Sequence, residues 1–225
     1  MKLPFDEIKI GHWTDTEART GCTVIRFPND VVASGEVRGG APATREFELL
    51  APERTVENVD AVVISGGSAF GLASTIGVVE FLEESDIGFP TAQGVVPIVV
   101  GMSLYDLGVG SSSVRPGLNE GRIACLDGEN NKSELATGRI GAGTGATTGN
   151  WSGKENLSNG GIGIASAEVE GVVVCSLFAV NAAGDVLNEE ISESFIKKNF
   201  QSSIGEEVSE STELMNTTLG VVMTN

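Results

Sequence analysis

The sequence predicts a layered protein of the α/β or α+β class, in which β-sheets pack against helices. Thirty glycines separate short β-branched runs, a pattern typical of strands joined by tight turns. The apolar run at 61–65 suits a strand covered on both faces, and a helical repeat follows it. Of the 225 residues 40% are hydrophobic, enough for a sizeable core, and we expect one domain over residues 1–225.

The first half of the chain is expected to combine strands with one long helix. Strands are predicted near residues 8–10, 22–27 and 31–37, before the strand at 61–65. Ser68 is a favourable N-cap for a helix of about sixteen residues. Apolar and acidic residues mark its buried and exposed sides, namely Leu72, Ile76, Val79 and Leu82 against Glu80, Glu83 and Glu84.

The second half is expected to contain mainly strands and loops. A strand or the start of a helix is predicted at 95–100, and a polar loop at 127–133. Residues 160–167 and 172–181 are interpreted as consecutive strands, joined by a hairpin turn at 168–171.

Composition excludes several classes of function. The formal net charge of −17, from 31 acidic and 14 basic residues, repels phosphate backbones, so we expect no nucleic-acid partner. No apolar stretch approaches the roughly 20 residues that span a bilayer. The N-terminal sequence carries acidic residues where a signal peptide would be apolar. A cytoplasmic protein without a membrane partner is therefore expected.

The cysteines and the single histidine predict neither a metal site nor a disulfide. Cys22, Cys125 and Cys175 lie far apart and form no Cys-x-x-Cys pair, so we expect buried thiols. Any Ser-His-Asp or Cys-His arrangement would have to use His12. A lone histidine beside Trp13 is more often a surface or packing residue than a catalytic base.

Two glycine-rich stretches resemble known motifs without completing them. Gly66-Gly67-Ser68-Ala-Phe-Gly lacks the spacing of a nucleophile elbow, and we expect a strand-to-helix turn whose N–H groups could hold an anion or a carboxylate. The stretch Gly-Ala-Gly-Thr-Gly-Ala at 141–146 matches a loose dinucleotide fingerprint, but its flanks are a poor strand and a poor helix start. A loop in which the backbone approaches another group closely is expected instead.

One remaining route to a hydrolase uses a nucleophile at a chain terminus. The free α-amine of a Thr or Ser, with a pKa of about 7.7–8.0, then acts as the base for its own hydroxyl. Cutting the chain to make this terminus calls for a flexible segment followed by Thr or Ser at the start of a strand. A weak helix is expected at 191–200, and the acidic, Ser-rich segment 201–215 is expected to be a mobile linker. Asn216-Thr217-Thr218 then opens an apolar run, although Thr-Thr is also common in ordinary strands.

Seven segments, in the same order and covering nearly the whole chain, carry a resemblance to a known family. They include the specific stretches Arg-Gly-Gly-Ala-Pro and Gly-Gly-Ser-Ala-Phe-Gly-Leu. The segments are 10–25, 37–46, 63–72, 96–108, 141–147, 179–185 and 216–225. The sequence resembles the L-aminopeptidase/D-esterase family of the DmpA type, which includes β-peptidyl aminopeptidases and nylon-oligomer hydrolases.

The resemblance implies a four-layer α-β-β-α sandwich, similar to N-terminal nucleophile hydrolases, that matures by self-cleavage between Asn216 and Thr217. Thr217 would be the nucleophile, Asn181 would stabilise the oxyanion, and Tyr105 would orient the nucleophile or the substrate amine. As ordinary residues, Asn181 would occupy a turn and Tyr105 would be a half-buried packing aromatic. The resemblance also implies a homo-oligomer, a tetramer in the family, without metal or organic cofactor.

Two departures from the family pattern bear on function. Asn150 stands where nylon hydrolases carry a lysine, and it can donate a hydrogen bond to a substrate but supplies no charge. Family members also continue beyond the strand that begins at the nucleophile. Residues 1–216 would then be the large-subunit portion and 217–225 the start of the small subunit, whose remainder is expected to be missing.

The sequence is compatible with two functions. The first is a self-processing hydrolase that removes N-terminal residues from short peptides, amides or esters. The second is a truncated or inactive homologue that acts as a scaffold or binds a small carboxylate or amine near the turn at 66–68.

Overall fold

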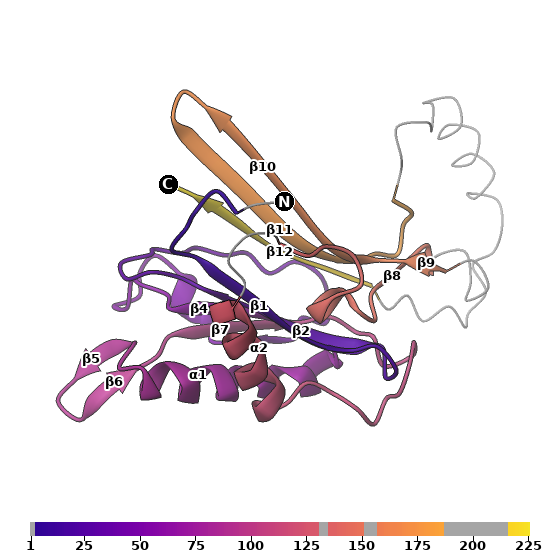
Figure 1. Cartoon of the computed structure of the whole chain (residues 1–225), viewed down its shortest axis with the longest axis horizontal. Helices are drawn as coiled ribbons and strands as arrows, with labels where there is room; N and C mark the ends of the chain where they lie inside the picture. The colour runs from indigo at the N-terminus through magenta and orange to yellow at the C-terminus, as the bar shows by residue number, and fades with distance from the viewer. Residues whose placement is uncertain (1–2, 131–134, 151–156, 187–215) are drawn as a thin grey trace.

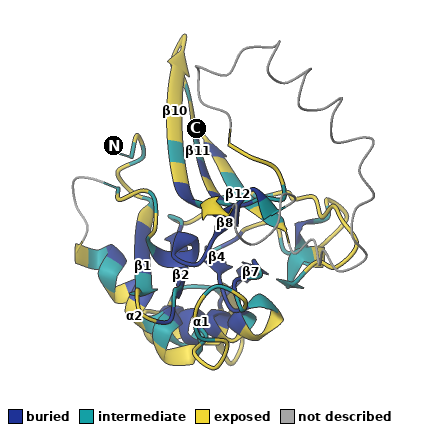
Figure 2. Cartoon of the chain, turned by 90° about the vertical axis from the view of Figure 1, so that its right-hand side faces the viewer, coloured by how far each residue is buried: buried dark blue, intermediate teal, exposed yellow. Residues whose placement is uncertain are grey.

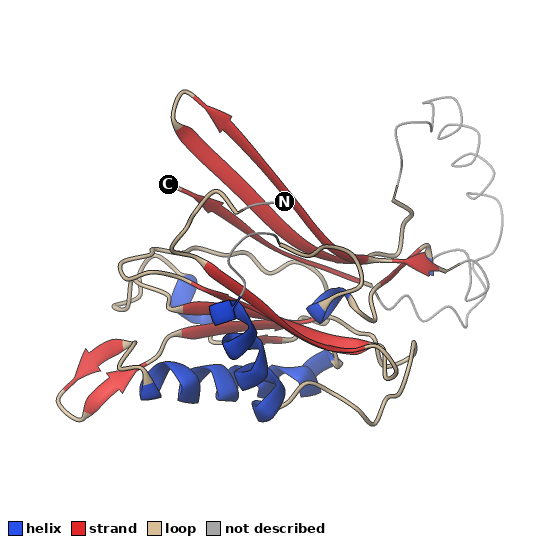
Figure 3. Ribbon diagram, in the orientation of Figure 1, coloured by secondary structure: helices blue, strands red, loops and turns tan. Residues whose placement is uncertain are grey.

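The computed structural model describes residues 3–130, 135–150, 157–186 and 216–225. Two β-sheets pack face to face, and two α-helices cover the outer face of the larger sheet (Figures 1 and 3). The predicted layered α/β (α+β) architecture is thereby confirmed. The described residues form three layers of the expected four-layer sandwich, since no helix among them covers the outer face of the smaller sheet.

The larger sheet has five strands in the order β1-β2-β4-β7-β3. In that order their bounds are Lys9–Asp15, Thr20–Arg26, Ala61–Ser65, Val99–Ser103 and Thr44–Arg45. β4 and β7 are parallel, and all other neighbours are antiparallel. The residues that follow β4 and β7 and those that precede β2 therefore meet at one end of the sheet.

The smaller sheet is antiparallel, in the order β10 (Gly161–Val169), β11 (Val172–Asn181) and β12 (Thr217–Thr224). The hairpin predicted from 160–167 and 172–181 is confirmed, as is the strand predicted after Asn216. The β11–β12 register places Asn181 directly opposite Thr217.

Short ribbons and helical segments complete the described fold. The ribbons are β5 (Phe89–Thr91) with β6 (Gly94–Val96), and β8 (Thr147–Thr148) with β9 (Ser158–Asn159). The 3₁₀ turns are η1 (Phe47–Leu50), η2 (Ser68–Ala73) and η3 (Gly141–Gly143), and the α-helices are α1 (Ser74–Glu84) and α2 (Leu118–Asn130).

The five-stranded sheet is buried on both faces. In β4, Val62 and Ile64 belong to the core between the two sheets, whereas Ala61 and Val63 belong to the core beneath the helices. Side chains alternate between the two faces of a strand, so a strand that serves two cores reads as the unbroken apolar run seen at 61–65.

The helix predicted from Ser68 forms in two parts. Ser68 is not the N-cap. It is the first residue of η2, with φ of 56°, and Gly67 precedes it without a side-chain capping bond. The α-helical part begins at Ser74 and buries Val78 and Leu82, but Ile76 is 38% exposed, so the predicted apolar side is partly wrong.

Small residues lie beside Val78 and Leu82 on the buried side of α1, namely Ser74, Thr75 and Gly77. A Cβ at Gly77 would collide with the Leu118 carbonyl, and one at Gly121 would collide with the Ser74 carbonyl. The two helices therefore cross at a distance that only glycine permits.

Three further expectations for the chain need correction or fall outside the structure. Residues 31–37 form no strand and contribute a single bridge, from Val32 to Asn58. Residues 127–130, predicted to lie in a polar loop, are the end of helix α2. The weak helix at 191–200 and the linker at 201–215 lie outside the described residues.

The outer face of the smaller sheet is largely exposed in the described chain (Figure 2). It carries Val172 at 54%, Val174 at 40% and Val222 at 63% exposure. None of the helices in the described ranges has the length and apolar character needed to span a membrane.

His12 packs inside β1 and is 8% exposed, which confirms the packing alternative among the expectations for it. Its Nδ1 lies 3.0 Å from the Thr23 hydroxyl, and its backbone N–H donates to Asp127 at 2.9 Å. Burial lowers the pKa of His12 to about 4, although the Asp127 carboxylate acts in the opposite direction. The imidazole is therefore neutral at pH 7.

This burial predicts that acid destabilises the fold through His12. Unfolded histidine has a pKa of about 6.5, so between pH 6.5 and 4 the unfolded chain takes up a proton that the folded chain refuses. The free energy of unfolding should fall by about 2 kcal/mol between pH 7 and pH 5 from this group alone. Urea unfolding at both pH values, compared with His12→Asn, measures the contribution. Parallel pH dependence in the two proteins would contradict it.

Candidate active site

The predicted nucleophile lies at the first position of β12, beside the last residue of β11. Thr217 and Asn181 are paired across the antiparallel ladder, so their Cα atoms are separated by roughly 4.5–5.5 Å and their side chains share a face. Asn181 is 1% exposed and points into the space between the sheets, whereas Thr217 is half-buried. Thr217, not the exposed Thr218, is thus the hydroxyl on the Asn181 side.

The amide of Asn181 is held at both ends. Its Oδ1 accepts a 2.9 Å hydrogen bond from the Thr147 N–H, and its Nδ2 donates to the Tyr105 carbonyl at 2.9 Å. These bonds fix which end of the amide is the donor. Asn181 is therefore a strand-end residue with an oriented side chain rather than the turn residue of the alternative interpretation.

Asn150 lies near Asn181, because both side chains contact Thr147. Its Nδ2 donates to the Thr147 hydroxyl at 3.2 Å and to the Ala182 carbonyl at 3.0 Å. The structure thus brings Asn150 and Asn181 together around Thr147. The sequence did not single out Thr147 as a site residue, although it closes the glycine-rich segment 141–147 that carries the family resemblance.

Tyr105 meets Asn181 through its backbone carbonyl. It follows β7 directly after Leu104, and its side chain is half-buried. The contact explains why this position matters for Asn181, but it is a main-chain contact, and the expectation that the phenol orients a nucleophile or amine stays a prediction.

The turn at 66–68 has no free backbone N–H for a ligand. The Gly66 N–H donates to the Gly21 carbonyl at 2.8 Å, and the Ser68 N–H donates to the Leu104 carbonyl at 2.9 Å. The Gly67 N–H donates to the Asp106 carboxylate at 2.7 Å. This geometry gives no support to substrate binding by Gly66, Gly67 and Ser68, because the carboxylate at the turn belongs to the protein.

The glycine-rich segment at 141–146 is a buried loop, as expected, with η3 at its start. Gly141 has φ of 51°, in the region that favours glycine. A side chain there would collide with Thr23 and His12. The start of the loop, η3, contacts strands of both sheets, and the loop leads to Thr147, whose N–H donates to Asn181.

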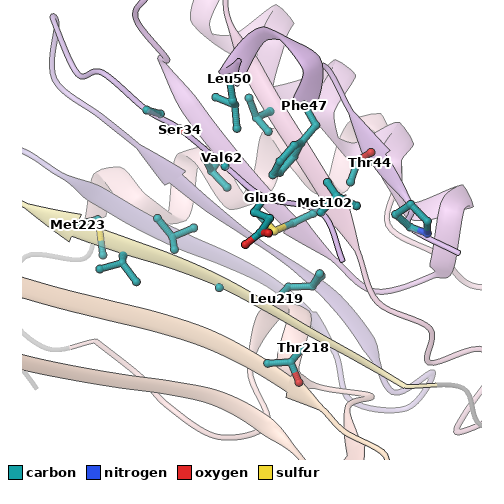
Figure 4. A pocket seen from close by; sticks show the side chains of 18 of the residues that line it. Ser34, Glu36, Thr44, Phe47, Leu50, Val62, Met102, Thr218, Leu219 and Met223 are labelled. Carbon is teal, nitrogen blue, oxygen red and sulfur yellow. The ribbon is translucent and has the colours of Figure 1, made fainter. Parts of the chain in front are cut away.

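A cavity of about 1010 Å³ opens along β12. Its lining includes Thr217, Leu219 and Met102. Figure 4 shows the Leu219 side chain directed toward Met102 and Glu36, whereas Thr218 extends to the other side of the strand. Alternate residues of a strand share a face, so Thr217 lies on the cavity side together with Leu219.

The three cysteine thiols are poorly placed for catalysis. Cys22, Cys125 and Cys175 are all buried free thiols, as expected. Burial raises the pKa of the Cys125 thiol to about 12 and also raises the pKa of Cys22, so neither supplies a thiolate at neutral pH. No group of three or more potential metal ligands occurs within the described ranges.

The arrangement of the two packed sheets is a fold of the N-terminal nucleophile hydrolase type. The structure aligns with the L-aminopeptidase D-Ala-esterase/amidase of Ochrobactrum anthropi, described as a new variant among the Ntn hydrolase fold, with a TM-score of 0.68 over 97% of this chain and 61% of that chain. The sequence identity is 18%, so this likeness concerns the fold.

The chain belongs to peptidase family S58, whose model matches residues 5–225. The family resemblance found in the sequence is thereby confirmed. A Mycobacterium leprae protein named uncharacterized aminopeptidase ML1167 is 39% identical over 197 residues, which cover 80% of this chain and 52% of that protein. The 6-aminohexanoate-oligomer endohydrolase of Agromyces sp. is 27% identical over all of this chain and 63% of its own length. The chain thus spans about half the length of the curated aminopeptidase relatives it matches.

Proposed function

We propose that this protein is a self-processing N-terminal nucleophile hydrolase, matured by cleavage between Asn216 and Thr217. The observation that carries the proposal is the pairing of Thr217 with the buried, oriented amide of Asn181 at the end of a cavity. Membership of a peptidase family supports the same reaction class.

Self-cleavage begins with attack of the Thr217 hydroxyl on the carbonyl carbon of Asn216. The C–N bond between the two residues breaks as the acyl group moves from nitrogen to oxygen, which gives an ester and a free Thr217 amine. Water then hydrolyses the ester and leaves a carboxylate on Asn216. The exposed position of Asn216 gives the new C-terminus room to move away from the strand.

Substrate hydrolysis then uses the new α-amine as the base for the Thr217 hydroxyl, with a pKa near 8. The hydroxyl attacks a substrate carbonyl, and the Asn181 amide donates to the developing oxyanion. The Tyr105 carbonyl takes one amide hydrogen of Asn181, and the second is available to the oxyanion. The leaving amine or alcohol takes the proton, and water hydrolyses the acyl-enzyme.

Short peptides, amides and esters are the substrates we propose, with removal of the N-terminal residue. The names of the relatives, an aminopeptidase and an oligomer endohydrolase, support an amide substrate. Asn150 would bind substrate by hydrogen bonding. We further propose a cytoplasmic homo-oligomer, a tetramer by analogy with the family, and the exposed apolar face of the smaller sheet supports association.

Incubation of freshly purified protein, followed by intact mass spectrometry, tests the proposal. We expect the full-length mass to be replaced by two fragments, the smaller beginning at Thr217, together with hydrolysis of amino-acid p-nitroanilides. An uncut chain without turnover would contradict the proposal and favour the non-catalytic scaffold.

A further inference from the structure

The carboxylate of Asp106 is the most enclosed acidic group near the candidate site. Asp106 follows Tyr105 and is 3% exposed. Its Oδ1 accepts the Gly67 N–H at 2.7 Å, and its Oδ2 accepts the Thr20 hydroxyl at 2.8 Å. Burial raises the pKa of this carboxyl, and the two hydrogen bonds act in the opposite direction. Asp106 itself follows β7, and its carboxylate accepts bonds from Thr20 at the start of β2 and from Gly67 after β4, so it joins three neighbouring strand ends into one unit.

Two glycines make the space that this carboxylate occupies. A Cβ at Gly66 would collide with the Asp106 carboxylate, and a Cβ at Gly145 would lie 2.7 Å from the Asp106 Cβ. Gly66 comes from the stretch 66–71 and Gly145 from the stretch 141–146. Both motifs noticed in the sequence therefore converge on Asp106.

Asp106 is coupled to Asn181 through one peptide plane. The Tyr105 carbonyl and the Asp106 N–H belong to the same planar peptide group, so anchoring the Asp106 side chain restricts the rotation of that carbonyl. The carbonyl in turn accepts the 2.9 Å hydrogen bond from Asn181 Nδ2. If it rotated, the amide of Asn181 would lose the partner that orients its donor end.

We propose that Asp106 is a positioning residue, which holds the Tyr105 carbonyl so that the Asn181 amide faces the Thr217 reaction centre. This inference rests on the proposed function for its kinetic consequence. Its structural part, the orientation of the Asn181 amide, stands independently of turnover.

The test compares Asp106→Ala with Asp60→Ala. Asp60 is a matched control, because its carboxylate accepts the Ile98 N–H at 2.7 Å beside the opposite end of β7, and burial also raises its pKa. We expect Asp106→Ala to lower the self-cleavage rate and kcat about 10- to 100-fold with KM changed less than about threefold. Asp106→Asn, which keeps an acceptor for Gly67, should recover most of the loss. Asp60→Ala should lower the melting temperature and leave both rates unchanged.

A second measurement reports on Asn181 directly. The side-chain NH₂ signals of Asn181, observed by NMR, should shift and exchange faster with solvent in Asp106→Ala but not in Asp60→Ala. Should Asp106→Ala fail to fold, Thr20→Val removes one of the two hydrogen bonds to the carboxylate. It is expected to lower kcat about 3- to 10-fold, less than Asp106→Ala, because the bond from the Gly67 N–H remains.

The outcomes separate the two proposals. Wild-type protein that neither self-cleaves nor turns over substrate refutes the proposed function, while the NMR comparison still decides the role of Asp106. Asn181 signals in Asp106→Ala that match the wild type overturn the positioning role. If the wild type is active, rates in Asp106→Ala that equal those in Asp60→Ala also overturn this role, and Thr20→Val is judged in the same way if it replaces Asp106→Ala.

Discussion

Thr217→Ala is expected to give an uncut chain with no measurable hydrolase activity. In the proposed mechanism the same hydroxyl attacks Asn216 and the substrate, so one substitution removes both steps. Loss of the nucleophile in a serine protease lowers kcat by a factor on the order of 10⁶, and we expect a loss of similar size here. Intact mass spectrometry measures the first effect, and p-nitroanilide hydrolysis measures the second.

Two control variants separate the chemistry from packing. Thr217→Ser keeps a hydroxyl at the same atom position and should still be cut, whereas Thr218→Ala alters the neighbouring hydroxyl on the exposed side of β12 and should behave like the wild type. A Thr217→Ala variant that is cut at this bond, or that hydrolyses substrate at the wild-type rate, would remove Thr217 from the mechanism.

Strands were predicted correctly from the sequence where burial left a clear hydrophobic pattern, either an alternation of buried and exposed residues or an unbroken apolar run. β4 reads as an unbroken apolar run because both of its faces are covered. In β11, Cys175, Leu177 and Ala179 are buried while alternate residues are more exposed, and the predicted bounds 172–181 match the strand. Residues 31–37 have similar composition but border the cavity, and they form no ladder.

Helix α2 was missed because its packing uses glycine where a helical pattern uses large apolar residues. A Cβ at Gly11 of β1 would collide with the backbone of Ala124 and Gly128. The helix crosses β1 this closely because Gly11 lacks a side chain, and it crosses α1 closely because Gly121 lacks one. Glycine lowers intrinsic helix propensity by about 1 kcal/mol, so the same residues that permit the contact remove the local signal for the helix.

The candidate site was predictable to the extent that its residues lie in family-like segments. Asn181 and Thr217 were predicted in this way, and the register of β11 and β12 brings them together. Thr147 and Asp106 were not found, since their contacts join segments far apart in the chain. The turn 66–68 was expected to hold a ligand anion or carboxylate, but its Gly67 N–H donates to Asp106, 39 residues further along the chain. A local sequence motif can predict that a turn presents a backbone N–H group, but it does not show which group accepts the hydrogen bond.

Asn181→Asp is expected to lower kcat by a factor of about 10² to 10³ with little change in KM. The variant keeps the shape of the side chain and an oxygen for the Thr147 N–H, but it removes the amide donor. Removal of one oxyanion donor costs about 3–4 kcal/mol in the transition state, and a carboxylate beside the developing oxyanion adds repulsion. Self-cleavage should slow to a similar degree, because it passes through the same kind of oxyanion. Steady-state kinetics and a time course of intact mass measure the two effects.

Asn150→Asp is the matched control for the introduced carboxylate. It alters a half-buried amide that contacts the same Thr147, but on the side of the Ala182 carbonyl rather than opposite Thr217. The fall in kcat of Asn150→Asp should correspond to one neutral hydrogen bond, which is about 1 kcal/mol or less than tenfold in rate. Equal losses in the two variants would mean that charge near Thr147, rather than the donor on Asn181, governs the rate. A loss in Asn181→Asp that falls on KM would likewise assign Asn181 to substrate binding, since an oxyanion donor acts only on the transition state.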